Sequence, residues 1–460
     1  MERNTFSGSL GFILASAASA VGLGNIWRFP YLAARDGGGV FILMYILLAM
    51  TFGFTLLITE VAIGRRSQQG PLTAYRFFHR RWGFLGYLAF LVPFIIYPYY
   101  CVIGGWVMKY LTAYLTLDAA AVTQEGYFTS FITSPAQPVV FLLLFAVISY
   151  HVVKRGVEHG IERLSRILMP ALLLMVIGIS AYSLTLSHTD ADGITRTGLQ
   201  GARYLLLPNF EGMTLKRLLM VALDATGQLF YSLSVAMGIM VAYGSYMKRD
   251  VNLGRAVDNI EICDTMIAVL AGLMIIPSVY VFTGTEGMSA GPGLMFIALP
   301  QIFASMGSIG TYVGLVFFLM VFFSALTSAI SILEACVSGM MDRFAWSRRR
   351  ALRIIALSSV FVSLAVSLGY NVLYFDLTLP NGVHAQLLDV FDYLSNNLLM
   401  PFLALLTCVL IGWVVSPRLL VGEIRLNGYK FRRKYIYILM LRFVVPFLLI
   451  VLLFGAIGLY

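Results

Sequence analysis

Long apolar segments alternate with short polar loops along almost the whole chain. Most of these segments reach the roughly 20 residues that a helix needs to cross a bilayer. The sequence therefore predicts an all-α polytopic membrane protein with about eleven transmembrane helices. The expected spans are residues 9–33, 38–64, 84–115, 137–153, 160–186, 216–246, 257–283, 310–341, 350–370, 384–414 and 434–458.

The first expected span is interrupted by polar and flexible residues. Residues 19–30 read SAVGLGNIWRFP, with two glycines, an amide and an arginine inside an apolar segment. Backbone groups left unpaired in lipid are costly, so a break here must line a cavity walled by protein. Carbonyls at the end of the first half-helix can bind a cation, and the N-terminal end of the second half favours a carboxylate. The pattern indicates a site for a zwitterion and sodium.

A second interruption lies in the sixth expected span, where residues 231–238 read YSLSVAMG. This break occupies the position in 216–414 that the first break occupies in 1–186. Two halves of five spans each must insert with opposite orientations, as in the inverted repeats of alternating-access transporters. We therefore expect a single transporter domain, 1–460, with broken helices 1 and 6 and a peripheral eleventh helix at 434–458.

The charged residues set the expected orientation. They make up 12% of the chain against 59% hydrophobic residues, which excludes an array of soluble domains. The net charge of +10 comes from arginines and lysines in alternate loops, which is the positive-inside pattern and not a sign of nucleic-acid binding. We expect a multi-pass protein of the cell inner (plasma) membrane, with the N-terminus cytoplasmic and the C-terminus outside.

Five motifs in order resemble the neurotransmitter:sodium symporter family. The most specific is GLGNIWRFP at 22–30. The others are GGG at 37–39, GQLF at 227–230, FSALTS at 323–328 and LDVFD at 388–392. The resemblance runs from about Arg3 to the end of the chain and implies a bacterial amino acid:sodium symporter.

The resemblance implies two sodium sites made of oxygen ligands. The first would use the Ala20 carbonyl, the Asn25 side chain, Ser232 oxygens, Asp264 and the substrate carboxylate. Direct contact between ion and substrate would make the two bind cooperatively. The second would use the carbonyls of Ala18, Val21 and Ser324 and the hydroxyls of Thr327 and Ser328, unless these hydroxyls bond back to their own helix.

Asp264 departs from the family, in which an asparagine is common at this position and animal members bind chloride nearby. A carboxylate at membrane depth is costly and functional by default. We expect its fixed charge to balance sodium in place of chloride, and Ala268 offers no hydroxyl at the family's chloride position. The alternative is a protonated Asp264 in a structural hydrogen bond.

The resemblance also assigns the two poles of the substrate. Its carboxylate would meet the amides of Leu23 and Gly24, beside Gly22, and the Tyr100 hydroxyl, unless Tyr100 serves only packing. Its amine would meet the carbonyls of Ala20, Tyr231 and Ser232 and the Ser234 hydroxyl. Its side chain would lie among Ile96, Ile103, Tyr231, Met237, Ala329 and Ile332, none of which is charged. This set predicts a hydrophobic or aromatic amino acid.

Two positions affect the expected range of substrates. Met237 stands where the family often has an aromatic residue, and an unbranched thioether adapts to ligands of different shapes, unless Met237 is plain core. Ala236 replaces a usual glycine and would act against this by narrowing the pocket. The sequence leaves the balance between the two effects open.

Two charged pairs are expected to close the site alternately. The outer gate would be Arg28 and Asp392, with Tyr231 as an aromatic lid and Gln228 beside them. The inner gate would be Arg3 and Asp342, with Tyr246 nearby, unless Arg3 only sets topology. A partly exposed ion pair contributes about 0–1 kcal/mol, which suits a gate that opens repeatedly.

These features predict a sodium-coupled secondary active symporter that imports a hydrophobic or aromatic amino acid by alternating access, with proton coupling through Asp264 as the alternative. Two sodium ions are expected and chloride is not. A channel or amino-acid-gated receptor is a less favoured alternative, because it would need a continuous polar pore lining and not a site closed at both ends.

We expect no enzymatic activity, because the sequence has no His or Cys cluster with metal-ligand spacing, no G-x-S-x-G and no P-loop. The expected partners are the amino acid, sodium and the bilayer, and the sequence leaves monomer and homodimer open.

Overall fold

The computed structural model describes residues 5–190, 193–284, 292–380 and 382–459, most of which are helical. Nine of the described helices are long and apolar enough to span a membrane, and the bent pair Ser9–Ala20 and Gly24–Arg35 adds a tenth. The remaining expected span, 216–246, is present as two helices separated by a break. The predicted helical membrane fold with broken helices 1 and 6 is confirmed.

In chain order, one series of elements extends to residue 206 and a second series begins at residue 215. The first is α1 (Ser9–Ala20), η1 (Gly24–Arg28), α2 (Phe29–Arg35), α3 (Gly39–Leu48), η2 (Ala49–Gly53), α4 (Phe54–Ser67), α5 (Pro71–Phe78), η3 (Arg80–Trp82), α6 (Phe84–Leu115), α7 (Ala119–Val122), α8 (Tyr127–Thr133), α9 (Gln137–Lys154), η4 (Val157–Glu162), α10 (Arg163–Leu184), β1 (Ser187–Thr189), β2 (Thr195–Thr197) and α11 (Gly198–Leu206). The second is α12 (Leu215–Leu233), α13 (Ile239–Ser245), α14 (Leu253–Thr283), η6 (Leu294–Ala298), α15 (Leu299–Ser305), α16 (Ser308–Phe344), α17 (Arg348–Leu368), β3 (Leu377–Thr378), β4 (His384–Ala385), α18 (Leu387–Asp392), η7 (Tyr393–Leu399), α19 (Met400–Val409), η8 (Leu410–Val415), α20 (Pro417–Ile424), η9 (Leu426–Gly428), α21 (Lys434–Leu439), η10 (Met440–Val444) and α22 (Val445–Ala456).

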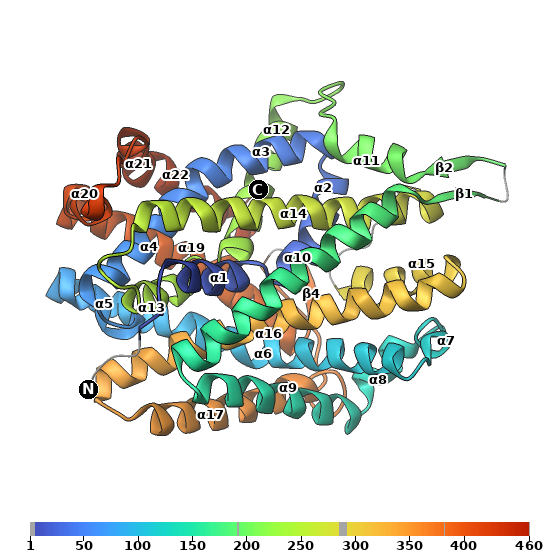
Figure 1. Cartoon of the computed structure of the whole chain (residues 1–460), viewed down its shortest axis with the longest axis horizontal. Coiled ribbons are helices and arrows are strands. Elements are labelled where there is room, and N and C mark those ends of the chain that lie inside the picture. Colours follow the sequence, from blue (N-terminus) through green and yellow to red (C-terminus); the bar gives the residue numbers. More distant parts are fainter. Residues whose placement is uncertain (1–4, 191–192, 285–291, 381, 460) are drawn as a thin grey trace.

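The short helices of the two broken spans lie inside the bundle. The long helices α6, α14 and α16 run along the long axis of the molecule, with α1 and α13 among them (Figure 1). α1 contacts α10, α14 and α16, and α13 contacts α4 and α16. Protein therefore surrounds both short helices, as backbone breaks at membrane depth require.

α6 is held close to its neighbour α9 by two glycines. A side chain at Gly104 would come within 2.5 Å of the Phe145 ring, and one at Gly105 would come within 2.7 Å of the Leu142 amide nitrogen. Small residues at such positions let membrane helices approach closely. This packing fixes the helix that carries three expected site residues, Ile96, Tyr100 and Ile103.

The loops at one end of the molecule contain structure that the hydrophobic pattern did not predict. β1 pairs antiparallel with β2, with Ser187 opposite Thr197, and the hairpin projects beyond the helices (Figure 1). A second short antiparallel pair joins β3 and β4. The segments α20 and α21 lie at the opposite end (Figure 1). The division into halves at 1–186 and 216–414 stays a prediction.

Candidate functional site

The first span comes apart between Ala20 and Gly24. α1 ends at Ala20, Val21 leaves the helical region with a ψ of 80°, and a π-helical turn begins at Gly24. The two parts of the span are bent by 53°. A side chain at Gly24 would lie 3.1 Å from Tyr231 Cβ, closer than an ordinary contact, so glycine favours this close approach to α12. The break lies where the sequence predicts it.

The sixth span comes apart between Leu233 and Ile239. Three residues of the break adopt left-handed backbone conformations, Ser234 with a φ of 52°, Ala236 with 58° and Gly238 with 68°. A left-handed conformation costs a residue with a Cβ about 1–2 kcal/mol. The surrounding contacts must therefore offset strain at Ser234 and Ala236. This segment is also a break that the sequence predicts.

Glu60 holds the second break in place. Its Oε1 accepts a hydrogen bond of 2.8 Å from the Ala236 amide. The side chain is buried, and its Oε2 has no hydrogen-bond partner among the described residues. Sequence reasoning missed Glu60. An acid inside the apolar segment 54–64 was the available signal, because carboxylates at membrane depth are rarely incidental.

Asp264, on α14, lies at the centre of a fully buried polar cluster with residues of η1, α3 and α12. Asn25 Nδ2 donates to its Oδ1 at 2.9 Å, and Ser232 Oγ donates to its Oδ2 at 2.6 Å. Tyr45, which the sequence did not single out, donates to the same Oδ2 at 3.2 Å. Asn25 Oδ1 has no partner among the described residues. An unpaired amide oxygen beside a buried carboxylate suits a hard cation, so this donor set fits sodium.

The second expected ion site joins the break in the first span to α16. Ser324 Oγ donates to the Val21 carbonyl at 2.9 Å, and Ser328 Oγ donates to the Ser19 carbonyl at 3.2 Å. Thr327 Oγ1 instead donates within its own helix, to the Ser324 carbonyl at 3.0 Å. A hydroxyl that donates keeps two acceptor lone pairs, so all three hydroxyls fit a cation site. The remaining expected ligands on α1, Ala18 and Ala20, are buried.

A cavity lies between the two breaks and helices α6 and α16. Ten expected substrate residues line it: Gly22, Leu23, Gly24, Ile96, Tyr100, Ile103, Tyr231, Ser234, Met237 and Ile332. Three others do not. The Ala20 carbonyl accepts the Gly22 amide, Ser232 bonds Asp264, and Ala329 is fully buried. Sequence reasoning missed Ser19, Trp27, Tyr99, Ile239, Ser328, Asp392 and Asn396 as lining residues.

The cavity has a polar end and an apolar part. The Tyr100 hydroxyl is buried and has no hydrogen-bond partner among the described residues. A side chain at Gly22 would lie 3.6 Å from this oxygen, so the backbone of the first break faces it. The Ser234 hydroxyl donates to the Ser19 carbonyl at 2.9 Å. Isoleucines and Met237 supply the apolar part.

Tyr231 closes the cavity on the side where the expected outer-gate residues Arg28 and Asp392 lie. The Arg28 guanidinium lies 4.0 Å from the centre of its ring, and its hydroxyl donates to Asp392 Oδ2 at 3.2 Å. Asn396 Nδ2 donates to Asp392 Oδ1 at 2.6 Å. Arg28 and Asp392, both described, form no direct ion pair, because the tyrosine lies between them. A second cavity of about 220 Å³, lined in part by Arg28, Tyr231 and Asn396, lies beyond this closure.

Gln228, the fourth residue of the expected outer gate, is buried next to the first break. Its Nε2 donates to the Gly24 carbonyl at 3.0 Å. Gln228 is on α12, so this bond links the two broken spans. Its place in the outer gate stays a prediction.

Around the expected inner gate, the structure shows a different set of contacts. Arg3 lies outside the described residues. Asp342 Oδ2 accepts the Gly70 amide at 2.5 Å, and Tyr246 donates to Glu334 Oε1 at 2.6 Å. Glu334 also forms an ion pair with Arg348. Sequence reasoning missed this buried pair, although Glu334 lies within an apolar span.

Comparisons with known proteins agree with this architecture. The model of the sodium:neurotransmitter symporter family matches residues 3–125 and 128–460. A sodium-dependent transporter of Bacillus subtilis is 33% identical, over 98% of this chain and 97% of that protein. A sodium-dependent transporter of Methanocaldococcus jannaschii is 30% identical, over 90% and 82%. The crystal structure of MhsT in complex with L-phenylalanine matches 99% of this chain and 100% of its own, with a TM-score of 0.85 and 32% identity. The chain therefore belongs to the sodium:neurotransmitter symporter family, whose members are transporters and not enzymes, and it is a sodium-dependent, multi-pass membrane protein.

Proposed function

We propose that this symporter imports a hydrophobic or aromatic amino acid by alternating access. The observation that carries the proposal is the cavity between the two breaks, where a polar end faces an apolar pocket without a cationic side chain among its described lining residues. A zwitterion with an apolar side chain matches both parts. The likeness to MhsT, which was solved with L-phenylalanine, supports the same class of substrate.

The substrate would lie with its charged groups against the two breaks. The carboxylate is assigned to the Tyr100 hydroxyl and the amides of Leu23 and Gly24. Because the Tyr100 hydroxyl is buried and has no partner among the described residues, a bound carboxylate would satisfy it. The amine is assigned to carbonyls of the second break beside Ser234 and Tyr231, where the helix has ended and its last carbonyls are released.

Sodium would be held at two places. The first comprises Asn25, Ser232, Asp264 and carbonyl oxygens near Ala20, and the second comprises Val21, Ser324, Thr327 and Ser328 with Ala18. Both touch the first break, so ion binding would fix the backbone that also receives the substrate. Each charge that crosses a potential of 100 mV is worth about 2.3 kcal/mol, so two ions can drive steep accumulation.

We further propose that Asp264 is ionised and makes chloride unnecessary. Asn25, Ser232 and Tyr45 all donate hydrogen bonds to its two oxygens, which suits an acceptor-only carboxylate better than a protonated acid. Its charge would balance sodium in a site that includes no other described acid. The cationic loops imply an orientation with the N-terminus in the cytoplasm and the C-terminus outside, in the plasma membrane.

A competition screen tests the proposed function. Proteoliposomes containing the full chain take up radiolabelled leucine or tryptophan in sodium chloride, sodium gluconate or choline chloride, with each common amino acid as competitor. We expect uptake in both sodium salts, none in choline, and competition only by hydrophobic and aromatic amino acids. Uptake that follows a pH gradient in choline would favour proton coupling, and loss of uptake in gluconate would contradict the role of Asp264.

A further inference from the structure

An apolar groove runs along the outside of the bundle between α3, η2 and α14. Its walls are formed by Ile46, Met50, Ile262, Met266, Val269 and Leu270, and its volume is about 670 Å³. Met50, Ile262 and Met266 are 52%, 62% and 40% exposed. A groove of this kind on a membrane-spanning surface accepts a hydrocarbon chain.

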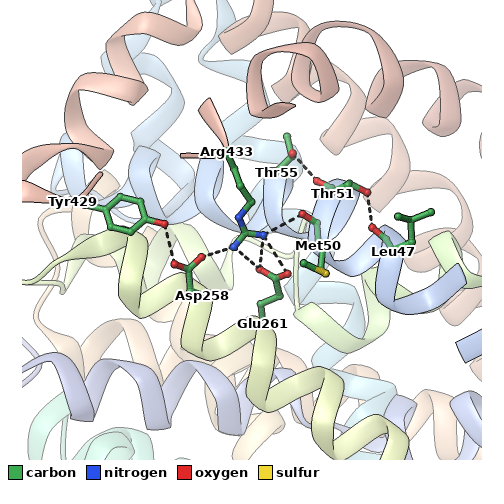
Figure 2. Close-up of polar contacts among 8 residues, drawn as sticks. All are labelled: Leu47, Met50, Thr51, Thr55, Asp258, Glu261, Tyr429 and Arg433. Atoms are coloured by element: carbon green, nitrogen blue, oxygen red, sulfur yellow. Dashed lines mark hydrogen bonds and ion pairs between the residues drawn. The ribbon is translucent and has the colours of Figure 1, made fainter. Parts of the chain in front are cut away.

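Arg433 closes one end of the groove. Its guanidinium pairs with Asp258 and Glu261 on α14 and donates to the Met50 carbonyl at 3.1 Å (Figure 2). It also lies 3.6 Å from the centre of the Phe54 ring. Tyr429 donates to the second oxygen of Asp258 at 2.9 Å (Figure 2). Asp258 and Glu261 are therefore already engaged inside the protein.

A basic hollow continues from the groove past Arg433. It is lined by Arg255, Asp258, Tyr429, Lys430, Arg432 and Arg433. Arg255, Lys430 and Arg432 are exposed, and none of them pairs with an acid in the part of the chain that the structure describes. The groove and the hollow together contain two acids, Asp258 and Glu261, and both already bind Arg433. The charges of the other three cations are therefore not balanced, which leaves positive charge at the mouth of the groove.

We propose that the groove and the hollow together bind an anionic phospholipid of the cytoplasmic leaflet. One acyl chain lies along the apolar groove, and the headgroup phosphate contacts Arg255, Lys430 and Arg432. Basic pockets between membrane helices on the cytoplasmic side select anionic headgroups. A soluble phosphate matches only the hollow, and a neutral lipid matches only the groove. The proposal rests on the proposed orientation but not on the identity of the substrate.

Native mass spectrometry of the full chain, titrated with phosphatidylglycerol or phosphatidylcholine, tests this assignment. Each basic residue near an anionic surface is worth about 1 kcal/mol, so we expect Lys430→Gln with Arg432→Gln to bind phosphatidylglycerol about 30-fold more weakly. Arg255→Gln alone should weaken binding about fivefold. Neither change should alter the affinity for phosphatidylcholine.

Three further variants distinguish a lipid site in this groove from nonspecific attraction between the lipid and the basic surface. Lys430→Arg with Arg432→Lys keeps both charges and should bind as the wild type does. Arg81→Gln removes an exposed cation that lines neither the groove nor the hollow and should have no effect. Thr265→Trp fills the groove and should weaken both lipids. Equal wild-type affinity for the two lipids, an unchanged double Gln variant, or displacement by millimolar glycerol phosphate would each overturn the proposal.

Discussion

Among single residues, Asp264 is the side chain on which ion coupling depends in this account. Asp264→Asn removes the only carboxylate that the described cluster offers to the first sodium site while keeping its shape. Because interactions with a charged group are worth about 1.5–3 kcal/mol, we expect sodium affinity to fall about 10–100-fold. The measurement is substrate binding to purified protein as a function of sodium concentration at constant ionic strength.

Asp250→Asn is the matched control for this change. Asp250 is exposed in the turn that precedes α14, so losing its charge should leave the sodium titration unchanged. If Asp264→Asn also left the titration unchanged, the carboxylate would be structural and the protonated alternative would hold.

A substitution at Tyr100 shows whether this residue binds the substrate or only packs. A buried hydroxyl without a partner costs free energy, so Tyr100→Phe should not lower the melting temperature of the substrate-free protein. If the hydroxyl binds the substrate carboxylate, the substrate Kd should rise about tenfold, from the loss of one hydrogen bond to a charged group. Tyr97→Phe, one turn earlier in α6 and outside the cavity lining, is the control. An unchanged Kd in Tyr100→Phe would show that the residue only packs.

For single residues, the family motifs predicted which side chains meet at the first ion site, but they did not predict the other side chains that contact the site residues. Asn25, Ser232 and Asp264 meet as the resemblance implies. Tyr45 could not be predicted, because an isolated tyrosine in an apolar span reads as an interfacial or packing residue. Asn396 was missed, although an amide inside the apolar span 384–414 was an available signal. Their roles come from contacts between helices that are far apart in the chain.

At the scale of single elements, the second break stores backbone strain at Ala236. Ala236→Gly removes the clash of a Cβ in the left-handed region, and this gain exceeds the added freedom of the unfolded chain. We expect the free energy of unfolding to rise by about 0.5–1 kcal/mol, seen as a higher melting temperature. Ala222→Gly, in the regular part of α12, should instead destabilise by about 0.5–1 kcal/mol. Equal loss in both variants would show that Ala236 is not strained.

The inner closure depends on the pair that joins α16 to α17. Arg348→Gln leaves the buried Glu334 without its cation, which strongly destabilises the packing of α16 against α17. Tyr246, bonded to the same carboxylate, also accepts the Phe6 amide on its carbonyl. We therefore expect faster hydrogen exchange in residues 5–12 and 239–247, measured by mass spectrometry. Arg353→Gln, exposed on the same helix, should leave exchange unchanged, and equal exchange in both variants would contradict this role.

Hydrophobic segments alone predicted most span boundaries to within a few residues. The expected span 84–115 corresponds to Phe84–Leu115, and 137–153 corresponds to Gln137–Lys154. The sequence placed Arg28, Asp392 and Tyr231 together at the outer gate, with Tyr231 as an aromatic lid. It did not predict that the Tyr231 ring lies between the two charged groups, because ring orientation depends on packing between distant helices.

For the whole molecule, two discontinuous helices inside one bundle bring the ion and substrate groups together. Gln228 on α12 bonds the first break at Gly24, and Ser234 in the second break bonds the Ser19 carbonyl of α1. Both breaks lie beside the cavity and the Asp264 cluster. Sodium and substrate would then bind to the same segments of backbone, so each should favour binding of the other. Tight binding therefore requires a zwitterion, with both charged groups present.

The most direct test is equilibrium binding of radiolabelled phenylalanine to the purified full chain, in sodium and in choline, with three competitors. We predict sodium-dependent binding that unlabelled phenylalanine displaces, while phenethylamine and phenylpropionate, which lack the carboxylate and the amine respectively, do not compete. Binding that persists in choline, or displacement by either single-charged analogue as strong as that by phenylalanine, would contradict the account.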